Sequence, residues 1–186
     1  MVSSVTGIFC IQILNGFAGT ADSVQLAKLC QDVGLPAELQ EKKRYSILHF
    51  NRLIDMGCQR FWPDLTLQQG QYRLGEKAIE VYKKTLAGRV SLQLSGSDAK
   101  RLASTTPDFY KAISTSGTVT FVDTGEKSYC LQFRGFESPP HYHYGAFAKF
   151  GQMMVPNGKF EMKILKLKNP EPGVYLSDMD FTGELP

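Results

Sequence analysis

The spacing of apolar residues changes midway along this chain, and that change restricts the folds that it can adopt. From Ser46 to Phe61 apolar side chains recur every three or four residues, as on one face of an α-helix. Between Gly117 and Arg134 they alternate with polar ones, as in half-buried β-strands. A helical half that precedes a run of strands indicates an α+β fold, because an α/β fold would alternate the two kinds of element along the chain.

Capping residues and prolines mark the helix ends in the first half. The segment Thr20–Ser23 is typical of an N-terminal cap, and Pro63 is expected to end a helix because it has no backbone N–H to donate. Gly70 and Gly75 lie inside a helical pattern, where we interpret them as packing sites more than as breaks. We expect longer helices at residues 20–34, 46–62 and 65–86, and short ones after Pro36 and around 97–103.

The second half is predicted to hold two β-hairpins with one helix between them. Residues 117–134 alternate around a turn at Asp123–Gly125, and residues 159–181 form a second pair of strands. A helix over 142–154 lies between the two hairpins. The chain is therefore expected to be one domain, with a mainly helical part over 1–105 and a β-β-α-β-β antiparallel sheet part over 106–186.

Charge and hydropathy argue against several classes of function. The chain carries 21 basic and 18 acidic residues, and the net charge of +3 is too small to imply nucleic-acid binding. We interpret the lysines within residues 159–168 as protection for an edge strand. No apolar run approaches the roughly 20 residues that span a bilayer, and residues 1–14 lack the features of a signal peptide. We therefore expect a cytoplasmic protein that neither enters a membrane nor binds nucleic acid.

The cysteines have neither metal-binding nor redox spacing, so we interpret each as a small buried apolar side chain. The sequence also lacks a Gly-x-Ser-x-Gly elbow and a glycine-rich phosphate loop. No catalytic residue is predicted, and the chain is expected not to be an enzyme. A pairing of Cys58 or Cys130 with His49 remains as an alternative. The cysteines are Cys10, Cys30, Cys58 and Cys130.

Two of the three histidines lie close together in the segment Ser138–Phe147, which raises the question of a metal site. The pair Pro139–Pro140 favours the start of a helix, and a helix would place His141 and His143 about 200° apart. No acidic residue stands beside them to orient a ring, as metal-binding histidines usually require. We predict no metal, interpret both histidines as solvent-facing, and expect Gly145 to allow close packing of the helix on the sheet.

Four short motifs carry a resemblance to a known family. The pair Trp62–Pro63 ends one helix, Leu74–Gly75 lies in the next, and Gly88–Arg89 closes the segment. Residues 142–151 then supply a later helix with two glycines. In these motifs, and over nearly its whole length, the chain resembles the myxobacterial paralogous family of uncharacterised domains.

The resemblance implies a fold similar to 4-vinyl reductase-like, transport-protein-particle and haem-nitric-oxide-binding domains. Such domains use a pocket between helices and sheet for an apolar ligand or for haem, although a shared fold is weak support for a shared function. In the haem-nitric-oxide-binding domains an axial histidine lies on the helix that leads into the sheet, whereas residues 97–113 of this chain contain none. We therefore predict no cofactor.

We expect a non-enzymatic cytoplasmic sensory or protein-interaction domain that forms a homodimer and binds a protein partner. The alternative is a small-molecule or haem-binding sensor with an apolar pocket between helices and sheet. Gly57, Gly70 and Gly75 are the interface candidates, because the resemblance implies pairing through the helical halves and small residues permit close approach. Aromatic side chains supply the candidate walls of a pocket: Phe50, Tyr72, Tyr82, Phe109, Tyr110, Phe133, Phe147 and Phe150.

Overall fold

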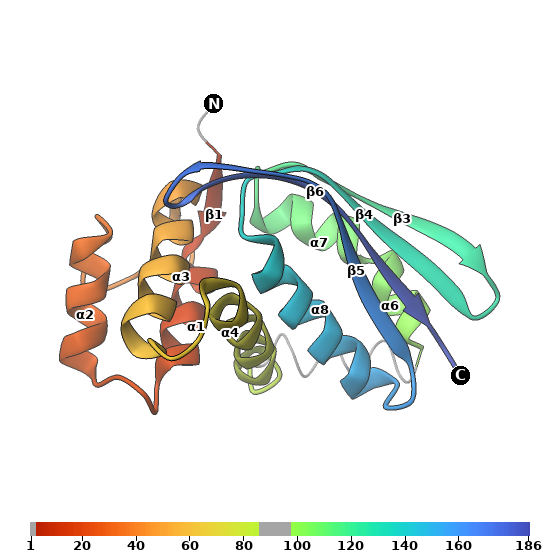
Figure 1. Cartoon of the computed structure of the whole chain (residues 1–186), viewed down its shortest axis with the longest axis horizontal. Coiled ribbons are helices and arrows are strands. Elements are labelled where there is room, and N and C mark those ends of the chain that lie inside the picture. Colours follow the sequence, from red (N-terminus) through yellow and green to blue (C-terminus); the bar gives the residue numbers. More distant parts are fainter. Residues whose placement is uncertain (1–2, 86–97) are drawn as a thin grey trace.

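The computed structural model describes residues 3–85 and 98–186, and the predicted Gly88–Arg89 motif and the end of the helix expected to reach Leu86 lie outside these ranges. Helices gather at one end of the molecule, and a curved sheet covers α8 and α7 at the other (Figure 1). The helices are α1 (Gly7–Phe17), α2 (Ser23–Asp32), α3 (Ile47–Phe61), α4 (Leu67–Tyr82), α6 (Ala99–Ser104), α7 (Thr106–Ile113) and α8 (Pro140–Met154).

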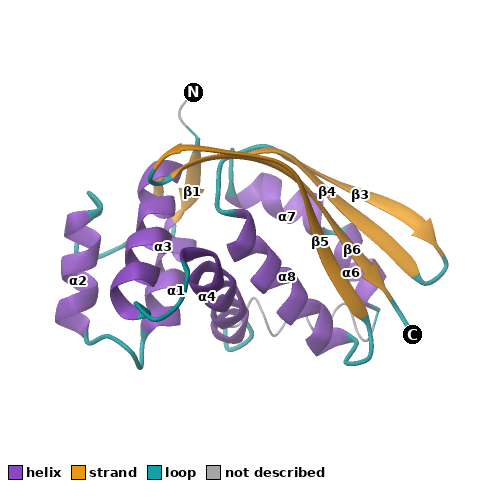
Figure 2. Cartoon of the chain, viewed as in Figure 1, coloured by secondary structure: helices purple, strands orange, loops and turns teal. Residues whose placement is uncertain are grey.

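The strands form two antiparallel sheets. In the larger sheet the strand order is β3-β4-β6-β5, and α8 follows β4 in the chain, so the α+β class and the β-β-α-β-β order are confirmed (Figure 2). Strand β5 lies at an edge, and the lysines on it are exposed, as edge protection requires. The strands are β1 (Ser4–Thr6), β2 (Arg44–Ser46), β3 (Thr118–Gly125), β4 (Ser128–Phe136), β5 (Lys159–Glu171) and β6 (Val174–Glu184).

The short helix expected after Pro36 is wrong. Residues 35–43 form turns that lead into β2, and β2 pairs with β1 in a small sheet that the alternation of the sequence did not reveal. The physical reason is that carbonyl groups of this segment bond elsewhere. The backbone N–H of Gly7 donates to the Lys43 carbonyl at 2.7 Å, and that of Ile8 donates to the Glu41 carbonyl at 3.0 Å.

Helix starts in the first half follow local capping chemistry. The Asp22 side chain accepts from the Gln25 backbone N–H at 2.8 Å, and the Gln25 side chain accepts from the Asp22 backbone N–H at 3.0 Å. Thr66 and Gln69 form the same reciprocal pair at the start of α4. Each cap contributes about 1 kcal/mol and fixes where the helix begins.

Helices α4 and α8 cross at van der Waals contact through a reciprocal pair of glycines. A Cβ on Gly145 of α8 would overlap the Tyr72 carbonyl oxygen of α4. A Cβ on Gly75 of α4 would overlap the Tyr142 carbonyl oxygen and come within 2.7 Å of the Ala146 backbone nitrogen. The expectation that Gly145 packs on the sheet is therefore corrected, because this residue faces α4.

The prediction of Gly57, Gly70 and Gly75 as interface residues is also corrected, because each of them packs inside the chain. A Cβ on Gly57 would overlap the Phe17 ring, and a Cβ on Gly70 would come within 2.9 Å of the Cys58 Cβ. All three glycines are buried within the chain, so a second copy does not reach them while this packing stands. Close approach does occur at these positions, but it joins helices of one chain.

Two apolar cores meet at α8. One lies among the first four helices and includes Ile13, Phe17, Leu53 and Leu74. The other lies between the sheet and α8 and includes Leu131, Phe133, Met179 and Phe181. The four cysteines are buried and free, as predicted. Within the two described ranges, no helix is both long enough and apolar enough to cross a membrane.

Candidate functional site

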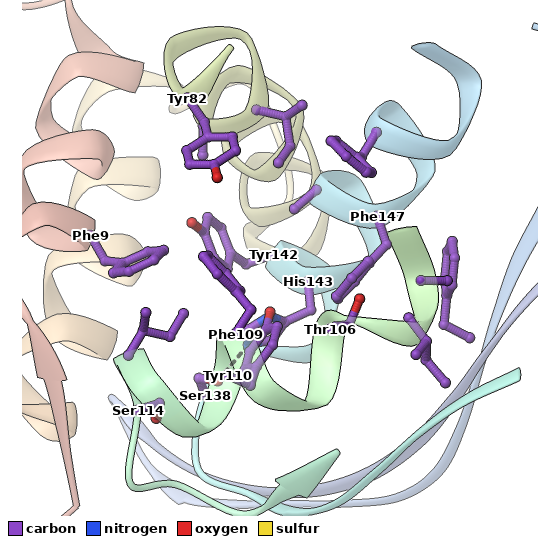
Figure 3. Close-up of a pocket in the computed structure, with 18 of the residues that line it drawn as sticks. Phe9, Tyr82, Thr106, Phe109, Tyr110, Ser114, Ser138, Tyr142, His143 and Phe147 are labelled. Atoms are coloured by element: carbon purple, nitrogen blue, oxygen red, sulfur yellow. Dashed lines mark hydrogen bonds between the residues drawn. The ribbon is translucent and has the colours of Figure 1, made fainter. Parts of the chain in front are cut away.

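A cavity of about 200 Å³ lies between the two cores, where α1, α4, α6, α7 and α8 face the inner side of the sheet (Figure 3). Val5, Phe9 and Gln12 come from the N-terminal segment, while Tyr129 and Phe181 come from the sheet. Among the described residues that line the cavity none carries a charged side chain. The cavity therefore presents an apolar, largely aromatic surface with a few uncharged polar groups.

The aromatic pocket candidates fall into two groups. Tyr72 packs edge-on against Tyr144 at 5.2 Å on the α4–α8 crossing, away from the cavity. Phe133 is fully buried behind the rings of Tyr110 and Phe147, at 5.7 and 5.3 Å, and does not line the cavity. The other candidates line it together, and their contact with a ligand stays a prediction: Phe50, Tyr82, Phe109, Tyr110, Phe147 and Phe150.

His143 is at the centre of a buried chain of hydrogen bonds. Its Nδ1 lies 2.9 Å from the Tyr110 hydroxyl, and its Nε2 lies 2.5 Å from Ser138 Oγ. Only 5% of His143 is exposed, and burial lowers its pKa to about 3. The solvent-facing interpretation of His143 is therefore wrong, because Pro139 and Pro140 start α8 so that this ring lies under Phe136 and Tyr110. His141 is half-buried.

The Ser138–His143 contact has the geometry of a nucleophile and its base, but not the required basicity. A histidine with a pKa near 3 is a poor acceptor for a serine proton at neutral pH. Its second nitrogen contacts the phenol of Tyr110, and burial raises the pKa of that phenol. A catalytic triad would place an orienting carboxylate at this position. We assign the arrangement a structural role: it joins α7 to α8 and to the segment that follows β4.

Gln12 and Tyr142 have polar groups at the cavity without partners. They are 5% and 6% exposed, and neither side chain makes a hydrogen bond within the described part of the chain. In Figure 3 the Tyr142 hydroxyl points into the cavity on the side of Tyr82. Burial raises the Tyr142 pKa, and the nearby Cys10 thiol of α1 raises it further. Their polar atoms can therefore form hydrogen bonds with a molecule in the cavity.

A second buried polar cluster lies at the tip of the β5–β6 hairpin, outside the cavity. The Tyr175 hydroxyl donates to Asp55 Oδ2 at 2.8 Å, and Gln71 Nε2 donates to Asp55 Oδ1 at 2.8 Å. Burial raises the Asp55 pKa, while the hydrogen bonds from Tyr175 and Gln71 oppose that change. Asn51 Nδ2 donates to the Gly173 carbonyl at 2.8 Å, so the cluster fixes the hairpin tip on α3 and α4.

Replacing Tyr175 by phenylalanine is expected to lower the free energy of unfolding by about 1–3 kcal/mol, because Asp55 Oδ2 loses its donor in a buried site. Urea denaturation at neutral pH measures the change. Tyr129→Phe is the matched control, since the Tyr129 hydroxyl lies against Gly183 and makes no hydrogen bond within the described residues. Equal losses in the two variants would contradict a stabilising role for the cluster.

The chain has an α+β fold similar to that of H-NOX domains. A Tt H-NOX variant aligns with a TM-score of 0.71 at 7% identity, over 97% of this chain and 94% of its own. An oxygen-binding H-NOX domain related to soluble guanylate cyclases aligns at 0.67 and 8% identity, over 97% and 96%. An Fe(II) unliganded mutant H-NOX protein from K. algicida aligns at 0.66 and 13% identity, over 96% and 95%. Identities this low show the fold alone.

Residues 3–155 match the family described as "Protein of unknown function (DUF2378)", and the chain belongs to that family. No curated protein matches the chain. The predicted similarity of fold to haem-nitric-oxide-binding domains is confirmed by the H-NOX structures. Myxobacterial membership and similarity to the 4-vinyl reductase-like and transport-protein-particle domains stay predictions.

The residues of the cavity do not fit haem. His143 is the histidine that lines it, and both ring nitrogens already lie within hydrogen-bonding distance of Tyr110 and Ser138. No described lining residue is a cation that would neutralise the two carboxylates of haem. An engineered cavity of about 150 Å³ holds benzene, so about 200 Å³ suits a molecule far smaller than haem. Among the described residues there is also no cluster of three metal-ligating side chains.

Proposed function

We propose that this chain is a non-enzymatic sensory domain that binds a small, neutral, largely apolar molecule in the cavity between helices and sheet. The observation that carries the proposal is the cavity itself, about 200 Å³ in volume and lined without charge by the described residues. Small-molecule sites are typically concave and mostly apolar, with a few polar groups that fix orientation. A charged ligand would lose its hydration there without gaining a partner.

The position of the cavity supports a sensory role. Its walls include α1 and α4 of the helical half, α6 and α7, and strands β4 and β6 of the sheet. A molecule in the cavity therefore touches both cores, and it stabilises whichever arrangement of the two halves it binds more tightly. Differential binding of this kind is what converts occupancy into a conformational signal.

The ligand is expected to contain about eight non-hydrogen atoms, by scaling from the benzene-sized cavity of about 150 Å³. Native mass spectrometry of the purified protein, followed by extraction and small-molecule mass spectrometry, tests for such a molecule. We expect a bound mass of this size and no Soret absorption. A Soret band, or a protein that binds neither a cellular molecule nor a small aromatic probe, would overturn the proposal. The same spectra measure the mass of the assembly, since homodimerisation and a protein partner stay predictions.

Filling the cavity provides a second test. Ala103 of α6 is buried at the cavity wall, so Ala103→Leu is expected to abolish ligand binding while raising the melting temperature of the unliganded protein. Ala112→Leu is the matched control, because Ala112 is exposed on α7 and does not line the cavity. Thermal melting and native mass spectrometry of both variants measure the two effects. Unchanged ligand binding by Ala103→Leu would place the ligand elsewhere.

A further inference from the structure

We propose that Gln12 and Tyr142 form the recognition site of the cavity and that its ligand is a phenol: an aromatic ring with one hydroxyl group. This inference rests on the proposed function and specifies the chemical class of the ligand. It is carried by two side chains on different elements, α1 and α8, that line one cavity and are each more than nine-tenths buried.

The first step is that the two polar groups are available to a ligand. Neither side chain forms a hydrogen bond to another described residue, in contrast to Ser138 and His143, which contact each other and Tyr110. The hydroxyl of Tyr129, which also lines the cavity, lies against Gly183 of β6 instead. Gln12 and Tyr142 are thus two buried polar side chains that a ligand can satisfy from within the cavity.

The second step is that the two groups lie on the same side of the cavity. Phe9 and Gln12, three residues apart, share one face of α1, and both line the cavity. Figure 3 shows the Tyr142 hydroxyl pointing into the cavity toward Tyr82, with Phe9 of α1 beside it. A single polar group on a ligand can therefore face both α1 and α8.

The third step concerns the chemistry that these groups select. The Gln12 amide has one acceptor oxygen and two N–H donors, and the Tyr142 hydroxyl both donates and accepts. A ligand hydroxyl complements them fully, because it can donate to Gln12 Oε1 while it accepts from Tyr142 or from Gln12 Nε2. An ether or a hydrocarbon cannot donate, and a carboxylate would bring a charge that no described lining residue neutralises. A water molecule would satisfy the amide but leave the aromatic walls without contacts.

The fourth step is the aromatic wall. The Phe109 ring of α7 lies edge to face against the rings of Phe9 and Tyr82, at centroid distances of 6.0 and 6.4 Å. Rings from three helices are therefore oriented at angles to one another around the cavity. Such walls favour a flat ring, which can make offset and edge contacts with each of them. Together with the volume of about 200 Å³, this arrangement suits a single substituted benzene ring.

Isothermal titration calorimetry with two matched probes tests the inference. p-Cresol and p-xylene have the same size and shape, and they differ in that a hydroxyl of one is a methyl group in the other. We expect the wild-type chain to bind p-cresol at least about tenfold more tightly than p-xylene, since a site with polar groups to satisfy discriminates against a ligand that lacks them. The anion p-toluate is expected not to bind.

Variants assign the preference to the two side chains. Gln12→Met keeps the length of the side chain but removes the amide, and we expect its preference for p-cresol to fall to about twofold or less while p-xylene still binds. Tyr142→Phe is expected to reduce the preference in part. Circular dichroism confirms that both variants are folded.

The outcomes separate this inference from the proposed function. Binding of neither probe to the wild-type chain would overturn both. Equal binding of p-cresol and p-xylene, unchanged in Gln12→Met, would leave an apolar ligand site but overturn the assignment of Gln12 and of a phenol. Tighter binding of p-toluate than of p-cresol would also overturn it, because it would require a cation at the site.

Discussion

Replacing Gly145 by alanine is expected to lower the free energy of unfolding by about 3 kcal/mol or more, the largest effect we expect for any single methyl group in this chain. The added Cβ would overlap the Tyr72 carbonyl oxygen, and a backbone atom in a helix cannot rotate away as a side chain can. Helices α4 and α8 would have to separate along their whole contact. Chemical denaturation monitored by circular dichroism measures the loss.

Gly16→Ala is the matched control for Gly145→Ala. Gly16 is also a buried helical glycine, but a Cβ there would meet the end of the Leu74 side chain at 2.8 Å, which can shift. We expect a much smaller cost, offset in part by the better helix propensity of alanine. Gly75→Ala is expected to resemble Gly145→Ala, and the double variant to cost less than the two together, because one separation of the helices relieves both overlaps. A loss below about 1 kcal/mol for Gly145→Ala would contradict the tight crossing.

The second large effect is an acid sensitivity due to His143. Burial lowers its folded pKa from 6.5 to about 3, so below pH 6.5 the unfolded chain binds a proton that the folded chain does not. The contribution of His143 to the free energy of unfolding is therefore complete above pH 6.5, and it is lost as the pH falls toward 3. The full loss is of order 5 kcal/mol, at about 1.4 kcal/mol for each pH unit of the pKa difference.

Urea denaturation between pH 7 and pH 3 tests the sign and the size of this loss. His143→Gln retains one donor and one acceptor without a titrating group, so we expect it to be less stable at pH 7 but to lose less stability on acidification. Asp55, whose raised pKa contributes in the opposite direction, is present in both proteins, and the difference between their slopes isolates His143. Parallel slopes would show that His143 is not buried in its neutral form.

The sequence predicted the order of the elements because each long segment carries its own period and its own cap. The helix from Ile47 to Phe61 presents one apolar face, and the hairpin of β3 and β4 alternates around its turn. The small β1–β2 sheet escaped prediction because each strand has three residues, too few for a period to show. Its pairing depends on contacts between segments about forty residues apart, which no local pattern contains.

The sequence predicted most of the aromatic residues at the candidate site, but not its polar residues. Aromatic residues such as Phe109 and Phe147 were expected at a pocket, and they line one. Gln12 was missed because a single glutamine in an apolar run suggests an interruption of the run, and its burial depends on helices far along the chain. His143 was misjudged for a similar reason. Its partner Ser138 is near in sequence, but Tyr110 is not, and the sequence alone does not place α7 over α8.

The glycine crossing of α4 and α8 also limits how a ligand can change this molecule. Two helices that touch backbone to backbone cannot slide without separating, so α4 and α8 are expected to move as one rigid body. Helix α7 differs, because none of its residues is fully buried and 40% of Phe109 is exposed. Among the described side chains, the hydrogen bond between Tyr110 and His143 ties α7 to the rigid pair, together with ring contacts of Phe109 with Tyr82 and of Tyr110 with Phe147. We therefore expect a ligand in the cavity to displace α7 and α6 relative to a fixed α4–α8 pair, and so to change the surface of the molecule.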